Sequence, residues 1–132
     1  MNDILKMLDW NNDIEIQKEG REKAKQIECL SLFMQPMDKG YNKNIWENCA
    51  LVLSEKEDDL LWPYLSRLLE WIQDLNWPGA MIIFERLQKY QKYEYLIEDI
   101  EDSMKIARAL DDEIWLENLS KLLCSFQNNK NQ

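Results

Sequence analysis

The stretch that decides the fold is residues 68–80, Leu-Leu-Glu-Trp-Ile-Gln-Asp-Leu-Asn-Trp-Pro-Gly-Ala. Apolar side chains recur at helical spacing before it and stop at Asp74. Pro78 has no backbone N–H and a φ preset near the helical value, so it suits the first turn of a following helix. Asp74 and Asn76 have short side chains that can accept hydrogen bonds from free N–H groups at that helix start. The stretch therefore predicts two helices joined by a tight polar corner.

Helical periodicity continues along most of the chain. Apolar residues recur every three or four positions, which places them on one face of a helix. The expected helices are residues 2–10, 13–34, 45–53, 54–73, 78–90, 93–107 and 112–126, the last capped by Asp111 and Asp112. Three glycines and three prolines in 132 residues are too few for a chain of short strands and turns. We expect one all-α domain over residues 1–132, with a loop at 35–44 and a frayed polar tail at 127–132.

A weak repeat indicates how the helices are arranged. Ile45-Trp46-Glu47-Asn48 is echoed by Ile114-Trp115-Leu116-Glu117-Asn118, and Trp77 lies 31 residues after Trp46 and 38 before Trp115. Each tryptophan stands near the start of the second helix of a pair. Such a period is typical of α-solenoids such as HEAT and armadillo proteins. We expect about three helix pairs with an extra N-terminal helix and tryptophans between the layers; the alternative is an irregular helical bundle.

Net charge limits the partners that the chain can bind. Acidic residues outnumber basic ones 25 to 16, a formal net charge of −9. Nucleic acids and anionic lipids are bound by clustered Lys and Arg, so neither is an expected partner. Nucleic-acid binding would need a basic stripe, for which Lys18, Arg21, Lys23 and Lys25 are the candidates. A protein partner of basic character fits the charge better. The sequence indicates no oligomeric state.

Cysteine usage indicates the compartment. Cys29, Cys49 and Cys124 are far apart and set among apolar residues. This pattern favours reduced, buried cysteines in a cytoplasmic protein. No basic region followed by an apolar run opens the chain, and no window approaches 18 consecutive apolar residues, so neither a signal peptide nor a membrane span is expected.

The residue types of common catalytic and metal sites are missing. The chain has no His, the usual base for Cys and Ser nucleophiles and a common zinc ligand. The cysteines lack Cys-x-x-Cys spacing, no carboxylate spacing matches a calcium loop, and three scattered glycines cannot form a phosphate-binding loop. We expect no metal and no cofactor, and an enzyme is the less favoured class.

The corner at residues 68–80 is the first candidate site. Glu70 and Asp74 lie four residues apart beside Trp71 and Trp77, and burial beside aromatic rings can raise a carboxylate pKa. With Asn76 they could line a small-molecule pocket. In the alternative interpretation, which we favour, Asp74 and Asn76 hold the corner backbone, Glu70 faces solvent and the tryptophans are core.

A second candidate is the acidic side of the 93–107 helix. Glu94, Glu98 and Glu101 fall on its polar face. Such a face can bind basic residues of a partner, although any solvated helix face has a similar pattern.

Trp46-Glu47-Asn48-Cys49-Ala50, together with residues 69–80, resembles an uncharacterised bacterial family, domain of unknown function 5071. Its mark is a Leu-Glu-Trp-(Leu or Ile)-Gln-Asp-x-Asn-Trp-Pro run, and the similarity is strongest from about Ile45 to Leu87. The resemblance implies an all-helical, HEAT-like fold. It implies no activity, cofactor or residue role. Gly79 departs from the family, where a bulkier apolar residue is also common, and is expected to loosen the helix start.

Two functional hypotheses follow from the sequence. The first is a small acidic HEAT-like module for protein–protein interaction, in one version an immunity or antidote protein that masks a basic toxin. The second is a small-ligand-binding protein or an enzyme that uses Glu70, Asp74 and Asn76 beside Trp71 and Trp77.

Overall fold

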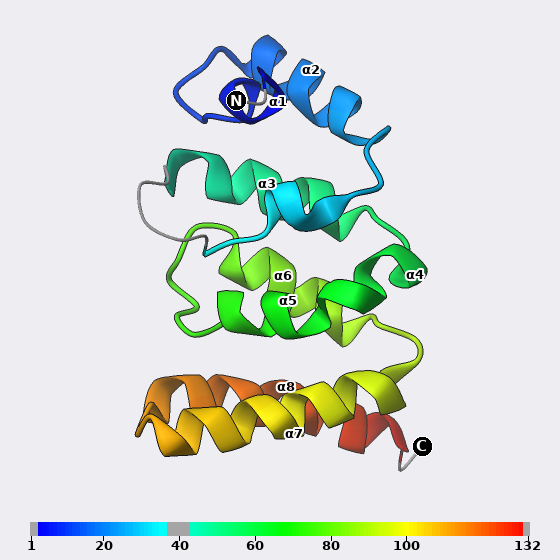
Figure 1. The fold of residues 1–132 in the computed structure, drawn as a ribbon, viewed down its shortest axis with the longest axis vertical. Coiled ribbons are helices and arrows are strands. Elements are labelled where there is room, and N and C mark those ends of the chain that lie inside the picture. Colours follow the sequence, from blue (N-terminus) through cyan, green and yellow to red (C-terminus); the bar gives the residue numbers. More distant parts are fainter. Residues whose placement is uncertain (1–2, 37–42, 131–132) are drawn as a thin grey trace.

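The computed structural model of the chain describes residues 3–36 and 43–130 (Figure 1). Within these ranges all regular structure is helical, as the periodicity predicts. The α-helices are α1 (Asp3–Met7), α2 (Ile14–Ala24), α3 (Trp46–Ser54), α4 (Asp58–Leu61), α5 (Leu65–Trp71), α6 (Ala80–Gln88), α7 (Tyr93–Ala109) and α8 (Glu113–Lys130). The 3-10 helices are η1 (Leu30–Phe33), η2 (Lys43–Ile45) and η3 (Trp62–Tyr64).

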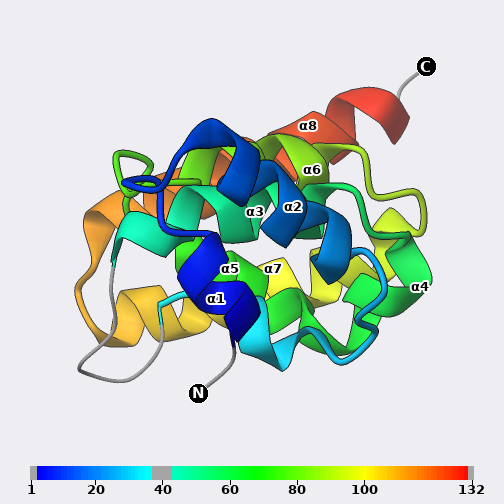
Figure 2. The ribbon, with the colours of Figure 1, turned by 90° about the horizontal axis from the view of Figure 1, so that it is seen from above.

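The helices are stacked in layers along the longest axis of the molecule (Figure 1). Within the layers, α1 packs against α2, η1 against α3, α5 against α6 and α7 against α8. Between the layers, α2 contacts α3, α3 contacts α6, and α6 contacts α8. Seen from above, α2, α3, α6 and α8 lie on one side of the molecule and α1, α5 and α7 on the other (Figure 2). The layers therefore form two rows of helices.

The helix predicted over residues 13–34 is wrong in its second half. α2 ends at Ala24, and residues 30–33 form η1 instead. The Nζ of Lys56 donates hydrogen bonds to the carbonyl oxygens of Ala24, Lys25 and Ile27 at 3.0, 3.1 and 2.8 Å. Because an ammonium group from a distant segment satisfies these carbonyls, the helix can stop there. α1, the expected extra N-terminal helix, packs against α2.

The break at the corner is confirmed, but the start of the second helix is not where Pro78 was expected to place it. α6 begins at Ala80, after Gly79 in the left-handed conformation with φ of 80°. A Cβ at Gly79 would lie 2.7 Å from the Cβ of Ala50 and 3.0 Å from the carbonyl oxygen of Trp46. Glycine therefore permits both the turn and the close approach of α3, and does not loosen the helix start.

Tryptophans form a large part of the core, including the three of the sequence repeat, Trp46, Trp77 and Trp115. Trp46, Trp71 and Trp115 are buried, and Trp77 packs against the core. The ring of Trp46 meets those of Trp71 and Trp77 edge-on, with centroids 6.1 and 5.5 Å apart. Such geometry is favourable for aromatic pairs and joins α3 to the corner of the next layer.

Two buried asparagines connect layers by equivalent hydrogen bonds. Asn48, in α3, donates from Nδ2 to the carbonyl oxygen of Leu8, just after α1, at 2.7 Å. Asn118, in α8, donates from Nδ2 to the carbonyl oxygen of Ile72, the residue after α5, at 2.8 Å. In each case the second helix of one layer caps the end of the first helix of the layer before it.

The ends of the predicted elements differ in detail. Of the two predicted caps of α8, Asp112 accepts a hydrogen bond at Oδ1 from the backbone N–H of Trp115 at 3.0 Å, whereas Asp111 lies before it in the left-handed conformation with φ of 54°. The frayed tail predicted at 127–132 is wrong as far as Lys130, since α8 continues without a Gly or Pro to stop it. Residues 131–132, residues 37–42 of the predicted loop and residues 1–2 lie outside the described residues.

Candidate functional site

The corner at residues 68–80 is packed with aromatic side chains, its own Trp71 and Trp77 and Trp46 of α3. Trp71 is fully buried, and its Nε1 donates to the carbonyl oxygen of Pro78 at 3.0 Å. The ammonium group of Lys43 lies 5.5 Å from the ring of Trp46 and 5.9 Å from that of Trp77. This cation covers the aromatic cluster in cation–π geometry. The tryptophans at the corner are therefore part of the core or packed against it.

Of the two interpretations of the corner, the structure favours the one in which Asp74 holds the backbone and Glu70 faces solvent. Asp74 accepts a hydrogen bond at Oδ1 from the backbone N–H of Asn76 at 2.8 Å, within the turn. It therefore holds the corner itself and does not cap α6 as predicted. Glu70 is partly exposed, with an oxygen 3.6 Å from Nε of Arg67, and Asn76 is exposed. None of the four hollows described below on residues 3–36 and 43–130 is lined by Glu70, Asp74 or Asn76.

The acidic residues of α7 are where the sequence predicts them. Glu94, Glu98 and Glu101 are all exposed. Glu98 and Glu101 line a hollow of about 590 Å³ that Lys105 and Arg108 also border. Their carboxylates are available to a partner, although two basic side chains share the surface.

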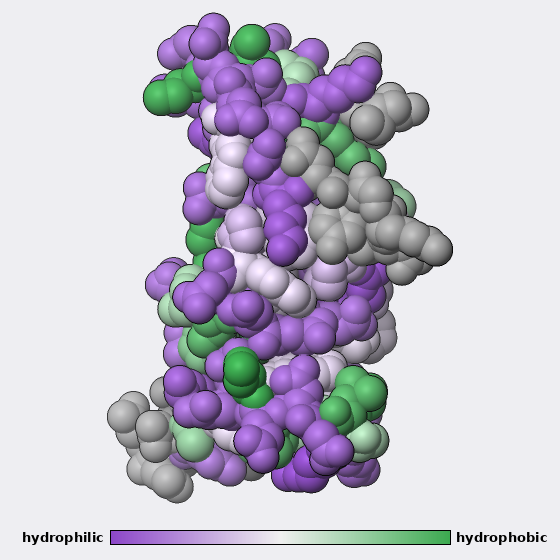
Figure 3. All heavy atoms as spheres, turned by 90° about the vertical axis from the view of Figure 1, so that its left-hand side faces the viewer, coloured by the Kyte–Doolittle hydropathy of each residue, from purple (hydrophilic) through white to green (hydrophobic). Residues whose placement is uncertain are grey.

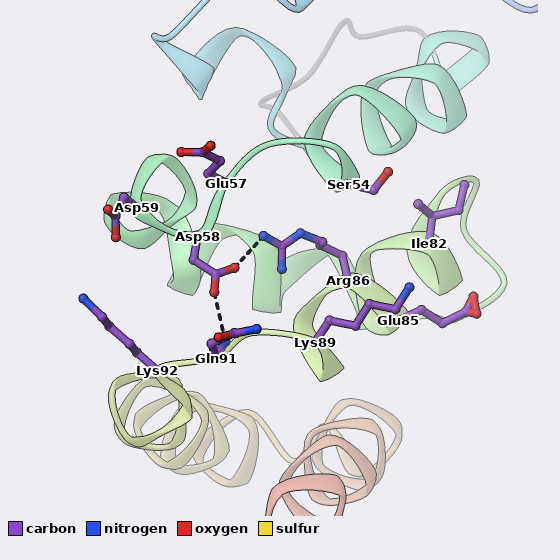
Figure 4. A pocket seen from close by; sticks show the side chains of 10 residues that line it. All are labelled: Ser54, Glu57, Asp58, Asp59, Ile82, Glu85, Arg86, Lys89, Gln91 and Lys92. Atoms are coloured by element: carbon purple, nitrogen blue, oxygen red, sulfur yellow. Dashed lines mark hydrogen bonds and ion pairs between the residues drawn. The ribbon is translucent and has the colours of Figure 1, made fainter.

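A hollow on the described surface, outside both candidate sites, was not predicted. It has a volume of about 700 Å³ and lies between the C-terminal end of α3, the start of α4, α6 and the α6–α7 loop (Figure 4). Its centre is an ion pair between Arg86 and Asp58 with N and O 2.5 Å apart. Asp58 also accepts from the backbone N–H of Gln91 at 2.9 Å, and Arg86 donates to the carbonyl oxygen of Lys56 at 2.8 Å.

The contacts at the centre of the hollow connect α4, α6 and the α6–α7 loop. Arg86 and Asp58 neutralise each other and hold the α6–α7 loop against α4. The rim carries charges of both signs, with Glu57, Asp59 and Glu85 against Lys89 and Lys92 (Figure 4). Sequence reasoning missed this site because Asp58 and Arg86 stand 28 residues apart and share no local motif.

A pair of exposed aromatic side chains marks another part of the surface. Trp62, in η3, is 57% exposed, and Tyr95, in the first turn of α7, is 52% exposed. Both line two adjoining hollows, one of about 280 Å³ with Asp59, and one of about 300 Å³ with Glu98 and Asp99. We call these five residues, Asp59, Trp62, Tyr95, Glu98 and Asp99, the aromatic–acidic surface.

Electrostatics at the aromatic–acidic surface disfavour further negative charge. The pKa of the Asp99 carboxyl is raised by burial and by the neighbouring carboxylates of Asp102 and Glu98. The pKa of Tyr90, which lines the first hollow, is raised by burial and by the carboxylates of Asp58 and Asp59. A cation placed here would relieve this repulsion.

Other parts of the described surface show fewer features of a binding site. The side of the stack seen in Figure 3 is mostly hydrophilic, with small separate apolar spots. Of the basic stripe considered for nucleic acids, Arg21 donates to Oδ1 of Asn48 at 2.5 Å, and Lys25 pairs with Glu22 at 2.7 Å. Two of its four cations are therefore engaged within the protein.

The cysteines are free, but the prediction that all three are buried is wrong. Cys49 is buried, whereas Cys29 and Cys124 are exposed. Cys29 lies outside any helix, because the predicted 13–34 helix ends early, and Cys124 lies on the outer side of α8. Within residues 3–36 and 43–130, no group of three or more Cys, Asp or Glu residues is placed to hold a metal ion. Among the helices in those ranges, none combines the length and apolar character that crossing a bilayer requires.

Comparison with known proteins identifies the family. The sequence model of a family described as Domain of unknown function (DUF5071) matches residues 35–131. No curated protein and no solved structure matches the chain. The matched region includes the corner and the aromatic–acidic surface, whereas α1, α2 and η1 precede it. Because the match covers well over half of the 132 residues, the chain belongs to this family of unknown function.

Proposed function

We propose that the protein is a HEAT-like helical-repeat module whose function is to bind another protein. The observation that carries this proposal is the equivalence of the Asn48 and Asn118 hydrogen bonds, each from the second helix of a layer to the end of a first helix in the preceding layer. A polar contact that recurs in this way supports a repeated unit. Repeat proteins present extended surfaces, and these surfaces are used chiefly for macromolecular recognition.

The charge of the chain supports a basic partner. With a formal net charge of −9, the protein attracts positively charged surfaces and repels nucleic acid and anionic lipid. The exposed carboxylates of Glu94, Glu98 and Glu101 along α7 add to this attraction. In the more specific version of the proposal, the partner is a basic toxin and this protein is its immunity or antidote protein.

The first experiment identifies and then reconstitutes the complex. The tagged full-length protein is cross-linked in its native host, each captured protein is purified separately, and binding is measured by calorimetry at low and moderate salt. We expect one basic partner bound at a defined stoichiometry, with affinity that falls at least tenfold as salt rises from about 50 to 300 mM. If no purified candidate binds, or if binding is indifferent to salt, the proposal fails.

Matched charge variants locate the contact. The double variant Glu94→Gln/Glu101→Gln removes two charges from α7, and Glu15→Gln/Glu19→Gln removes two exposed charges from α2. We expect only the α7 variant to weaken binding, by about tenfold for two exposed ion pairs. Equal effects would mean that overall charge, not α7, attracts the partner. To test the toxin version, the partner is expressed in cells with and without this protein. We expect the partner alone to inhibit growth and co-expression of this protein to relieve the inhibition.

A further inference from the structure

The aromatic–acidic surface exposes side chains that helical proteins usually bury. Trp62 is 57% exposed and Tyr95 52% exposed, whereas Trp46, Trp71 and Trp115 are in the core. Trp62 lies in the short η3 helix between α4 and α5, and Tyr95 lies at the start of α7 in the next layer. A single exposed apolar side chain is ordinary, as for Trp10 at 42% exposure, but two aromatic rings that line the same hollows form a surface of the kind used in recognition.

The two rings line two hollows of similar size. The first, of about 280 Å³, is completed by Asp59, Tyr90 and Lys92. The second, of about 300 Å³, is completed by Pro63, Leu65, Ser66, Glu98 and Asp99. Both hollows therefore combine the rings of Trp62 and Tyr95 with at least one carboxylate.

Charge at the surface is predominantly negative. Three carboxylates, those of Asp59, Glu98 and Asp99, face one ammonium group, that of Lys92. Two of the three interact, because the pKa of Asp99 is raised by burial and by the carboxylates of Asp102 and Glu98. A ligand that combines a flat face with positive charge would meet the rings and the carboxylates together.

We propose that the aromatic–acidic surface binds an arginine side chain of the partner protein, with the guanidinium group stacked on Trp62 or Tyr95 and hydrogen-bonded to Glu98 or Asp99. This inference rests on the proposed protein-binding function and names the chemistry of the contact. Guanidinium is planar, weakly hydrated and able to pair with a carboxylate through two parallel hydrogen bonds, so it fits this surface better than a lysine ammonium group. Single-stranded nucleic acid also stacks on aromatic rings, but its phosphates would be repelled by the carboxylates.

The corner of the same molecule provides an internal precedent. There, the ammonium group of Lys43 lies over Trp46 at 5.5 Å and over Trp77 at 5.9 Å. The chain thus already uses a cation to cover aromatic rings. At the aromatic–acidic surface the partner would supply that cation.

The test uses the full-length protein and two peptides that differ by one group. Acetyl-Gly-Arg-Gly-amide is compared with the same peptide containing citrulline, the neutral isostere of arginine, and the indole N–H signal of Trp62 is followed by NMR. We expect the arginine peptide to shift this signal with saturable, millimolar binding, and the citrulline peptide to bind about tenfold more weakly. No saturable shift with arginine, or an equal response to citrulline, overturns the proposal.

Variants separate the site from overall charge. Trp62→Ala and Glu98→Gln change exposed side chains, so both are expected to fold, and circular dichroism confirms this. For Trp62→Ala, in which the reporting indole is lost, binding is read from the backbone amide of Tyr95. We expect the affinity for the arginine peptide to fall at least fivefold in each variant. Glu117→Gln removes the same unit of charge from an exposed site on α8 and is expected to have no effect. Equal weakening in Glu117→Gln overturns the proposal.

The outcome is distinguishable from that of the proposed function. If a purified partner binds and Trp62→Ala or Glu98→Gln leaves its affinity unchanged, the protein-binding function stands and the arginine site is wrong. If the arginine peptide binds as expected while no partner is found by cross-linking, the site stands and the proposed function fails.

Discussion

Single thiols differ in reactivity according to their surroundings. Burial raises the pKa of Cys49 to about 12, whereas a hydrogen bond with the Ser31 hydroxyl lowers the pKa of the exposed Cys29. Since the thiolate is the reactive form, we expect Cys29 and Cys124 to be labelled by a thiol reagent in the folded protein, and Cys49 only after unfolding. Mass spectrometry of labelled peptides checks this. Equal labelling rates for all three would contradict the burial of Cys49.

Asp99 is a residue at which stability and binding oppose each other. Its pKa is raised by burial and by Asp102 and Glu98, so the folded state binds its proton more tightly than the unfolded state does. The group therefore contributes stability below its unfolded pKa, and this contribution is lost as pH rises through the folded pKa. We expect Asp99→Asn to stabilise the protein at neutral pH by about 0.5 kcal/mol, the size of one like-charge pair on a helix.

Denaturant unfolding at two pH values tests this expectation. The gain from Asp99→Asn should be present at pH 7 and should diminish near pH 3.5, where the wild-type carboxyl is largely protonated and therefore as uncharged as the amide that replaces it. Glu117→Gln is the matched control, because it removes an exposed charge on α8 whose carboxylate oxygen lies 3.8 Å from the ammonium nitrogen of Lys121, a group of opposite charge. A gain independent of pH would exclude like-charge repulsion as its cause. Asp99→Asn should also weaken binding of the arginine peptide.

At the scale of elements, buried amides hold one layer to the next. Asn118 donates to the carbonyl oxygen of Ile72, at the end of α5, from a position on α8 that is 5% exposed. Asn118→Ala would leave that carbonyl without its donor, at a cost of about 1–3 kcal/mol for a buried group. Asn76→Ala, on the exposed corner, is the control and should change stability by less than about 0.5 kcal/mol. Chemical unfolding measures both, and equal effects would refute the anchoring role.

Element boundaries were predictable where their causes are local. The cap of α8 by Asp112 depends on a residue three positions away, and the periodic stripe of α7 on residues within the helix. The end of α2 was not predictable, because the ammonium group that satisfies its carbonyls comes from Lys56, more than 25 residues later. Gly79 was misjudged for the same reason, since what limits it is the close approach of Ala50.

For the whole molecule, Lys56 connects three layers. Its Nζ donates to three carbonyl oxygens at the end of α2, and its own carbonyl oxygen accepts from Arg86 of α6. Lys56→Met keeps the apolar stem and removes the donors. We expect a loss of about 1–3 kcal/mol and faster hydrogen exchange in α2, while α7 and α8 stay protected.

Hydrogen exchange with mass spectrometry resolves these regions. Lys121→Met, which removes an exposed ammonium group from α8, is the control and should leave the exchange of α2 unchanged. If Lys56→Met accelerated exchange equally throughout the chain, the layers would unfold as one unit and not separately.

The candidate site was only partly predictable from sequence. The acidic face of α7 followed from the spacing of Glu94, Glu98 and Glu101, which are exposed as expected. The partnership of Trp62 with Tyr95 did not, because 33 residues separate them and either ring could equally have been core. Nothing in the local sequence distinguishes the exposed Trp62 from the buried Trp71.

By itself, the sequence determined that the protein is helical, that two helices are separated by a corner near residue 77, and that the protein carries a net negative charge. These properties depend on periodicity, capping and composition, which act over a few residues or on the chain as a sum. The tertiary structure alone decided that α1 pairs with α2, that Asn48 and Asn118 reach the carbonyl oxygens of Leu8 and Ile72, and that Trp62 remains in solvent. The physical reason is that burial and hydrogen-bond pairing depend on which distant segments meet.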